Sequence, residues 1–126
     1  MHIFFDVDHC IIDSDDRLRP GVRELFERLR EAGHTISLWS GLGPRWEVVQ
    51  RHGLHDLVAG CYDKPLYEYD RMLGPLGIAA RPDFMVDDHP HLPYHFGGCT
   101  VSHYRRPDPA DREMERVWEE IQARPG

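Results

Sequence analysis

The sequence predicts an α/β fold in which about five parallel strands form one sheet with helices on both faces, a three-layer Rossmann-like arrangement. Apolar runs of strand length alternate along the chain with segments of helical periodicity, and Gly or Pro stands at most junctions. At 126 residues the chain suits one domain, which we place over residues 1–126. In such a fold, a site is expected where the carboxyl ends of the strands meet.

The first half of the chain predicts two strands and two helices. Residues 2–5 form an apolar run of strand length, and residues 35–39 form a second one. Residues 20–32 carry apolar side chains at helical spacing and end at a glycine, which is typical of a helix and its stop signal. After the second strand, a helix of about two turns is expected to begin near Pro44 and to close at Gly53.

The second half predicts three more strands and two more helices. The strands are expected over residues 57–61, 83–86 and 98–103. The first of the two helices includes Tyr69, Met72 and Leu73 at helical spacing. The last one presents an apolar face formed by Met114, Val117, Trp118 and Ile121. Strand and helix therefore alternate along most of the chain, as in a sheet with helices on both faces.

Charge and composition exclude several classes of partner. The formal net charge of −7 disfavours nonspecific binding to nucleic acid or anionic lipid, because both are polyanions. No apolar run approaches the length of a membrane span and no signal peptide precedes Asp6, so we expect no membrane segment and a cytoplasmic protein. Cys10, Cys61 and Cys99 are odd in number and far apart, which predicts reduced, mostly buried thiols.

Polar side chains stand at the ends of four successive predicted strands. The spacing between them leaves room for about one helix each time, so parallel pairing would bring them to one edge of the sheet. Taken singly, each has an ordinary explanation, such as a solvated turn or a helix cap, but their joint position favours a site. The residues are Asp6 and Asp8 after the first strand, Ser40 after the second, Lys64 after the third, and Asp87 and Asp88 after the fourth.

Four short motifs carry these residues, and together they resemble a known family. The stretches FFDVDHCII, ISLWSG, YDKP and FMVDDHP are similar, in this order, to the four motifs of the haloacid dehalogenase (HAD) superfamily of phosphohydrolases and phosphotransferases. The resemblance extends over residues 2–103, and four motifs in the correct order are far more specific than an isolated Asp-x-Asp. It implies an HAD-type phosphatase that hydrolyses a phosphate monoester.

The resemblance implies different work for the first two carboxylates. Asp6 would be the nucleophile and would form an aspartyl-phosphate that water then hydrolyses. Asp8 would protonate the leaving oxygen and afterwards activate the water. Nucleophile and substrate are both anionic, so the site also needs a cation and hydrogen-bond donors around the phosphoryl oxygens.

Mg²⁺ is the cation that the resemblance implies. Asp6 and the backbone carbonyl of Asp8 would bind it, because Mg²⁺ prefers oxygen ligands and keeps several waters. Asp88 would complete the site from the fourth strand. Asp87 is left open between a direct ligand and an outer-shell acceptor.

Four further residues are candidates for binding the phosphoryl group. The hydroxyl of Ser40 and the adjacent Gly41 would face the phosphoryl oxygens, and the ammonium of Lys64 would offset the charge of the clustered carboxylates. Arg45 lies near the expected mouth of the site. It is left open between a substrate ligand and a residue that starts the helix after the second strand.

Two other metal sites are weaker interpretations. Residues 13–24 mimic a calcium-binding loop, but Leu18 stands where that loop needs Gly. Three histidines near the fourth motif suggest zinc, namely His89, His91 and His95. No paired cysteines accompany them, and Pro93 is expected to break the helix that would align His91 with His95. We therefore favour Mg²⁺ at the aspartates.

The chain departs from larger HAD relatives because neither connection between motifs has room for a cap domain. Water would have to be excluded by a large substrate or by a neighbouring subunit of a homo-oligomer, or it would not be excluded very effectively. The expected substrate is a phosphorylated small molecule or a phosphoprotein, with nucleic acid disfavoured by charge. His9 and Cys10 also stand where many relatives carry Gly and then Thr or Val, which affects the flap beside the site.

Two other classes of function fit part of this pattern. A noncatalytic binding module could keep the HAD fold and lose turnover. A receiver-type phosphoacceptor domain also combines a five-stranded parallel sheet with acidic residues, a hydroxyl and a lysine. In that family the paired acids follow the first strand, whereas Asp87 and Asp88 come last. The order of the motifs therefore favours the phosphatase.

Overall fold

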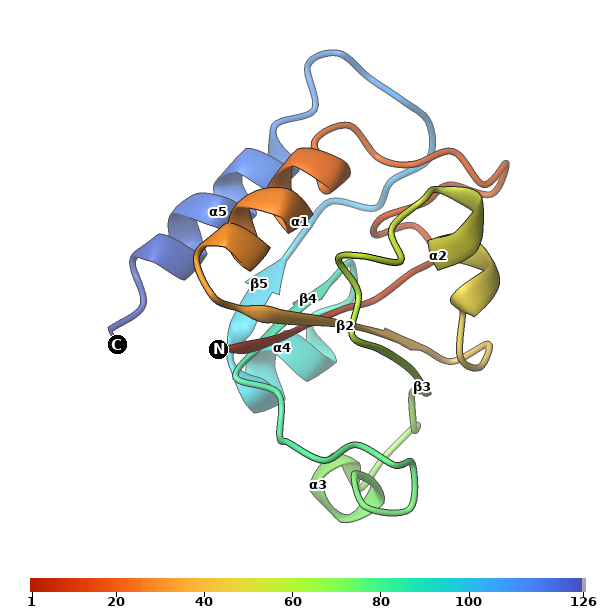
Figure 1. Ribbon diagram of the computed structural model, residues 1–126, viewed down its shortest axis with the longest axis vertical. Coiled ribbons are helices and arrows are strands. Elements are labelled where there is room, and N and C mark those ends of the chain that lie inside the picture. The colour runs from red at the N-terminus through yellow and green to blue at the C-terminus, as the bar shows by residue number, and fades with distance from the viewer. Residues whose placement is uncertain (126) are drawn as a thin grey trace.

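The protein has one five-stranded parallel sheet, in the strand order β3-β2-β1-β4-β5 (Figure 1). The computed structural model describes residues 1–125. The central strand β1 (His2–Phe5) pairs with β2 (Thr35–Ser40) on one side and β4 (Phe84–Asp87) on the other. The edge strands are β3 (Gly60–Asp63) and β5 (Gly98–Thr100). The predicted parallel α/β fold is confirmed.

Helices cover both faces of the sheet because side chains alternate along β1. Ile3 and Phe5 face one apolar core, and Phe4 faces the other. Apolar side chains of α1 (Val22–Glu31), α2 (Trp46–Arg51) and α5 (Glu113–Gln122) fill the first core, where α1 and α5 lie side by side in Figure 1. The second core is covered by α3 (Tyr69–Met72) and α4 (His91–Phe96).

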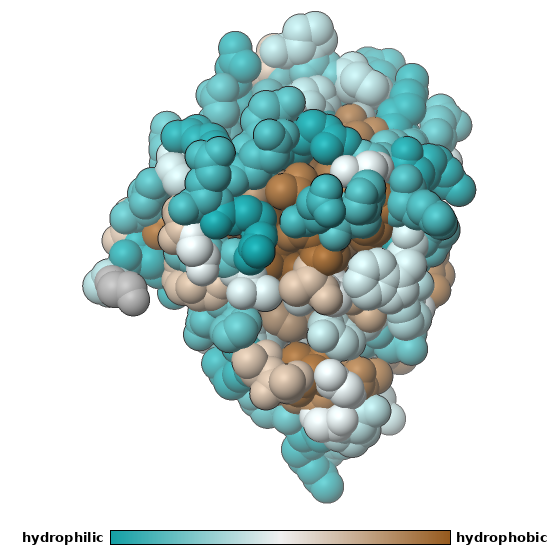
Figure 2. All heavy atoms as spheres, in the orientation of Figure 1, coloured by the Kyte–Doolittle hydropathy of each residue, from teal (hydrophilic) through white to brown (hydrophobic). Residues whose placement is uncertain are grey.

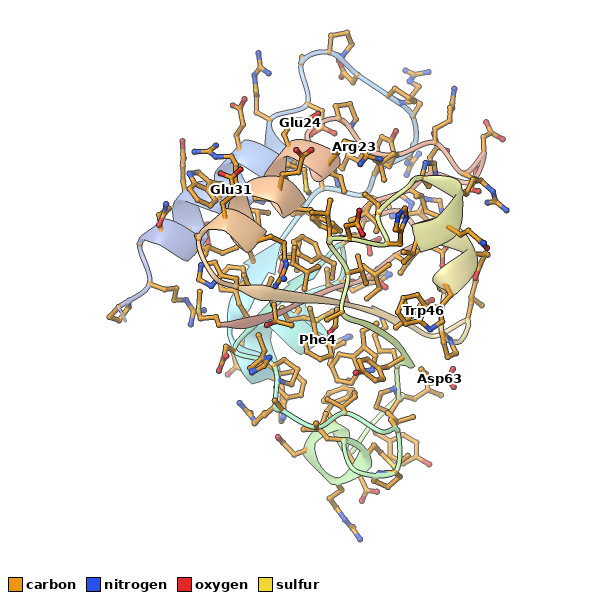
Figure 3. The ribbon with its side chains drawn as sticks, in the orientation of Figure 1. Phe4, Arg23, Glu24, Glu31, Trp46 and Asp63 are labelled. Carbon is orange, nitrogen blue, oxygen red and sulfur yellow. The ribbon has the colours of Figure 1, made fainter. Side chains whose placement is uncertain are left out.

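The outward faces of the helices are polar. On α1, Arg23, Glu24 and Glu31 project away from the sheet, while Phe4 lies within it (Figure 3). Figure 2 shows the same face, on which hydrophilic residues surround smaller apolar areas. Within residues 1–125, no domain is inserted between β1 and α1 or between β2 and β3. In the same range, no helix is long and apolar enough to cross a membrane.

The third strand lies two to three residues later than the sequence predicts. Leu57 and Val58 belong to the turn that follows α2, in which the Val58 N–H donates to the Leu54 carbonyl at 3.1 Å. Both side chains pack against the first core and are apolar for that reason. A short buried turn and a short buried strand have the same apolar composition, so periodicity could not separate them.

The segment after β4 forms a helix where a break is predicted. Pro93 is the third residue of α4, and the helix continues to Phe96. The expectation that Pro93 breaks this helix is wrong, because the first N–H groups of a helix have no partner within it and proline loses nothing there. His91 and His95 therefore do lie on one helix, one turn apart.

The fifth strand is shorter than predicted, since β5 ends at Thr100. The Val101 N–H still donates to the Asp87 carbonyl at 2.9 Å, but the chain then leaves the sheet. Tyr104 donates its N–H to the carbonyl of His9 at 2.8 Å, so this segment crosses over the loop that follows β1. The three cysteines are free and buried, as predicted.

Candidate functional site

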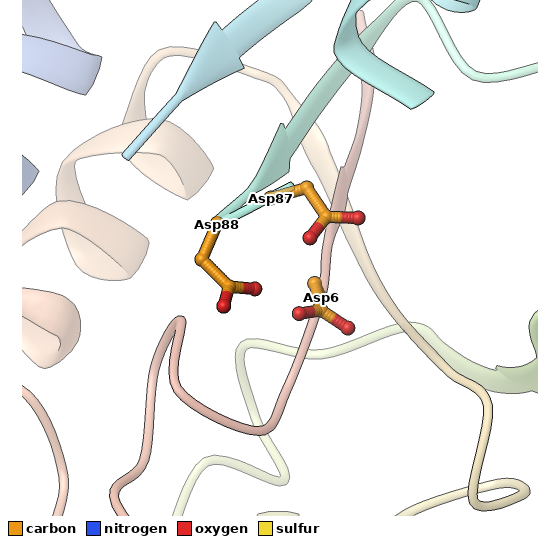
Figure 4. A group of neighbouring side chains, drawn as sticks. All are labelled: Asp6, Asp87 and Asp88. Carbon is orange, nitrogen blue, oxygen red and sulfur yellow. The ribbon is translucent and has the colours of Figure 1, made fainter. Parts of the chain in front are cut away.

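Asp6, Asp87 and Asp88 meet at the carboxyl ends of β1 and β4 (Figure 4). The Asp6 N–H donates to the Val86 carbonyl at 2.8 Å, which continues the pairing of the two strands and fixes where Asp6 stands. One carboxylate oxygen from each residue lies within 4.8 Å of the others. Three converging carboxylate oxygens form a donor set that suits a hard divalent cation.

Lys64 lies against two of these carboxylates. Its Nζ atom is 2.8 Å from Asp6 Oδ1 and 3.2 Å from Asp87 Oδ2. The Lys64 N–H also donates to the Ser40 carbonyl at 2.9 Å, which anchors the residue at the end of β3. Burial works to lower the pKa of Lys64, but the charges of Asp6 and Asp87 outweigh it and raise that pKa above its ordinary value. Lys64 is therefore a fixed positive charge.

The pKa of the Asp6 carboxyl is raised by its buried position among the other carboxylates. Burial and the negative charge of Asp87 raise the pKa of Asp6 to about 8, although Lys64 acts in the opposite direction. Without a further cation, these effects favour the protonated form of Asp6 at neutral pH. A divalent cation in this position would displace that proton and favour three ionised carboxylates.

Asp88 has one satisfied oxygen and one that is not. His103 Nδ1 lies 2.8 Å from Oδ2, whereas Oδ1 is buried with no hydrogen-bond partner among the described residues. The side chain is only 2% exposed, so water does not reach it freely. Burial opposes ionisation of Asp88, but the nearby Asp6 carboxyl and the hydrogen bond with His103 outweigh it and hold its pKa below the ordinary value. A buried, ionised oxygen without a partner is costly unless a ligand completes it.

Asp8 lies outside this group and contacts Arg45. Arg45 Nη1 is 2.5 Å from Asp8 Oδ2 and 3.5 Å from Ser40 Oγ, while its Nε atom bonds to Glu47. Arg45 precedes α2, as expected of a residue that starts this helix, and its role as a substrate ligand stays a prediction. Within the described residues, no backbone N–H donates to the Asp8 carbonyl, the group expected to bind Mg²⁺.

Ser40 and Gly41 lie at the end of β2. The Ser40 side chain is buried, and its hydroxyl oxygen accepts the Leu42 N–H at 3.1 Å, which leaves the hydroxyl hydrogen free to donate. Gly41 is exposed, with open space where a side chain would stand. On the other side of Lys64, a pocket of about 220 Å³ opens between Pro65, Leu92 and Asp87.

Neither weaker metal site is assembled. Asp13 accepts N–H groups from Asp15 and Arg17, so its carboxylate closes a turn. The side chain of His95 bonds to Asp70 at 2.6 Å, and that of His89 is 71% exposed. Across residues 1–125, the three aspartates are the one group of potential metal ligands whose atoms converge.

His103 and His9 lie beside the site, although neither was predicted from the sequence as a site residue. The two rings stack with centroids 4.1 Å apart, and His9 Nδ1 lies 3.0 Å from the Tyr104 carbonyl. His9 has a φ of 61°, a conformation that turns the loop after β1 toward this contact. His103 follows the fifth strand at the same edge, so the strand-end rule that found the other residues also applied to it.

No family model matches the chain, and a search of curated proteins found no match. The assignment of a function therefore depends on the chemistry of the residues gathered at this edge of the sheet.

Proposed function

We propose that the protein is a Mg²⁺-dependent phosphohydrolase of HAD type, which cleaves a phosphate monoester through an aspartyl-phosphate on Asp6. One observation carries the proposal: the carboxylates of Asp6, Asp87 and Asp88 converge, Asp88 has a buried oxygen without a partner, and Lys64 lies against the other two. Burying several carboxylates together is unfavourable, and such clusters are typical of sites that bind a cation and an anionic substrate.

The donor set fits Mg²⁺. Asp6, Asp88 and the Asp8 carbonyl would hold it directly or through water, with Asp87 beside them. When bound, Mg²⁺ would offset the repulsion between the carboxylates and the phosphoryl oxygens. The four motifs that resemble the HAD superfamily supply the same residues in the same order, which supports this ion over zinc.

The chain's own side chains would bind and orient the substrate. Lys64 and the Ser40 hydroxyl would donate to phosphoryl oxygens, and Asp6 would attack phosphorus while the bond to the leaving oxygen breaks. Asp8 would pass a proton to that oxygen and later take one from water. Arg45 holds Asp8 Oδ2, so the geometry supports a step in which an incoming phosphoryl group draws Arg45 away from Asp8.

The Arg45–Asp8 ion pair also favours a second candidate function. If Arg45 stays on Asp8, the site could accept a phosphoryl group on Asp6 but lack a free acid and base for turnover. The chain would then be a noncatalytic phosphoryl-binding module. A receiver-type phosphoacceptor draws no support from this contact, because the acceptor would stand on β1 rather than β3.

The test is hydrolysis of an aryl phosphate with Mg²⁺, after chelation, and after Mg²⁺ is restored. We expect activity to vanish with chelator and to return with Mg²⁺, and Asp88→Asn to lower it by about 100-fold or more. Asp63→Asn is the matched control: this exposed carboxylate ends β3 at the same edge but lies outside the group (Figure 3). Activity that survives chelation would contradict the proposal, and stable labelling without turnover would support the binding module.

A further inference from the structure

A second pocket of about 480 Å³ lies beside the site, under the loop that follows β5. Arg105, Arg106 and Arg112 line it, and His103 forms the end that faces the aspartates. We call this the basic pocket. The proposed reaction uses none of the three arginines.

Arg105 and Arg106 stand apart from the other basic side chains. Among residues 1–125, every other lysine or arginine contacts a carboxylate, a carbonyl or an aromatic ring, whereas the structure shows no such partner for these two. Their side chains are exposed, adjacent in sequence and part of the same pocket. The basic residues that have such a partner are Arg17, Arg19, Arg23, Arg28, Arg30, Arg45, Arg51, Lys64, Arg71, Arg81, Arg112, Arg116 and Arg124.

The acidic residues of the basic pocket are already engaged. Asp111 binds the buried Arg19 at 2.8 Å, and Glu113 binds Arg116 at 2.9 Å. Asp108 accepts the Ala110 N–H at 2.9 Å and is the one carboxylate there without a cationic partner. The pocket therefore keeps a positive excess in a chain whose net charge is −7. Such a local excess attracts anions.

The basic pocket is joined to the aspartates by fixed contacts. His103, in its wall, hydrogen-bonds Asp88, and Tyr104 is buried against the loop that carries His9. Arg105 follows two residues after His103, so their Cα atoms lie within about 7.6 Å of each other. An extended arginine side chain adds a similar reach, which lets its guanidinium meet a substrate bound at Asp6.

We propose that Arg105 and Arg106 bind a second anionic group of the substrate, so that the preferred substrate is a small phosphate monoester carrying a further carboxylate or phosphate. The proposal rests on the proposed function, because it places the scissile phosphoryl group at Asp6. Guanidinium groups recognise carboxylate and phosphate alike through paired hydrogen bonds. Arg19 holds the start of the loop that carries both arginines, through the Ser102 carbonyl and hydroxyl.

The experiment compares matched substrates on matched variants. The substrates are an ω-phosphonooxy alkanoate, its neutral amide and the corresponding alkanediol bisphosphate, each at graded chain length. The variants are Arg105→Gln with Arg106→Gln, and the control Arg71→Gln, an exposed arginine on α3. In the wild-type protein, we expect kcat/KM for the alkanoate to exceed that for the amide by about tenfold, through KM, and to lose this preference at high salt. The bisphosphate arm shows whether phosphate is preferred to carboxylate.

The double variant should lose the preference, whereas Arg71→Gln should keep it. An unchanged preference in the double variant, or an equal loss on alkanoate and amide, would overturn the proposal. If no ester is hydrolysed at all, the proposed phosphatase function is wrong. Calorimetric binding of the alkanediol bisphosphate then tests separately whether Arg105 and Arg106 bind anions. Tighter binding to the wild type than to the double variant supports anion binding by the two arginines, and equal binding overturns it.

Discussion

At the scale of single residues, the surroundings of Asp88 are those that the proposed metal site requires. His103 holds one carboxylate oxygen at 2.8 Å, and the other oxygen is buried without a partner in a side chain that converges with Asp6 and Asp87. His9 stacks on the face of the His103 ring, with the ring centroids 4.1 Å apart. A partner that orients a ligand in this way usually affects metal affinity almost as much as the ligand itself.

We therefore expect His103→Ala to weaken divalent-cation binding by roughly tenfold or more. His103→Asn should recover part of the loss, because its amide can donate from nearly the same position as Nδ1. Titration with Mn²⁺, followed by electron spin resonance, measures the affinity without any enzymatic assay. His55→Ala is the control, since His55 is exposed and remote from the aspartates. Equal affinity in all four proteins would contradict this role of His103.

Asp6 makes the stability of the metal-free protein depend on pH. Its folded-state pKa of about 8 lies above its ordinary value of 3.8, so the folded protein binds a proton that the unfolded chain releases as pH rises between these values. The contribution of this proton is complete below about pH 4 and is lost as pH approaches 8. Asp6→Asn removes the titrating group and keeps the size of the side chain.

In chelator, Asp6→Asn should raise the free energy of unfolding relative to the wild type by about 1 to 2 kcal/mol at pH 8, and by little at pH 4. The difference should shrink when Mg²⁺ is added, because the cation stabilises only the wild-type carboxylate. Urea unfolding at several pH values measures both effects. If Asp6→Asn is less stable than the wild type at pH 8, the ionised Asp6 carboxylate does not destabilise the metal-free folded state.

At the scale of elements, Arg19 joins three segments that are far apart in the sequence. Its side chain is almost fully buried, and its donors reach Cys10, Ser102 and Asp111. It therefore ties the loop after β1 to the chain after β5 and to the approach to α5. This network positions both the loop carrying Asp8 and the loop carrying His103.

Arg19→Ala should lower the free energy of unfolding by about 3 to 5 kcal/mol, because it removes the donors of one Asp111 carboxylate oxygen, the Ser102 carbonyl and the buried Cys10 carbonyl. Arg30→Ala is the control, since Arg30 makes one exposed hydrogen bond at the end of α1. Thermal unfolding followed by circular dichroism gives both values. A loss below 1 kcal/mol for Arg19→Ala would mean that water replaces its hydrogen bonds.

At the scale of the whole molecule, much of the architecture was predictable because strand and helix signals are local and repeated. The alternation of periods predicted the parallel sheet, and the strand-end rule placed Asp6, Lys64, Asp87 and Asp88 at one edge, where they do meet. The Asp8–Arg45 ion pair could not be predicted from the sequence, because it depends on how two loops fold over each other. For the same reason, the stacking of His9 on His103 joins residues that no local pattern connects.

The central claim is that Asp6 is the nucleophile of a phosphohydrolase, and rapid-quench labelling with a radioactive aryl phosphate tests it most directly. Because an aryl leaving group needs no proton, Asp8→Asn should slow hydrolysis of the intermediate more than its formation, and labelled protein should accumulate. Asp6→Asn should take up no label while remaining folded. Label on the Asp6→Asn protein, or none on Asp8→Asn under conditions where the wild type turns over, would contradict the assignment.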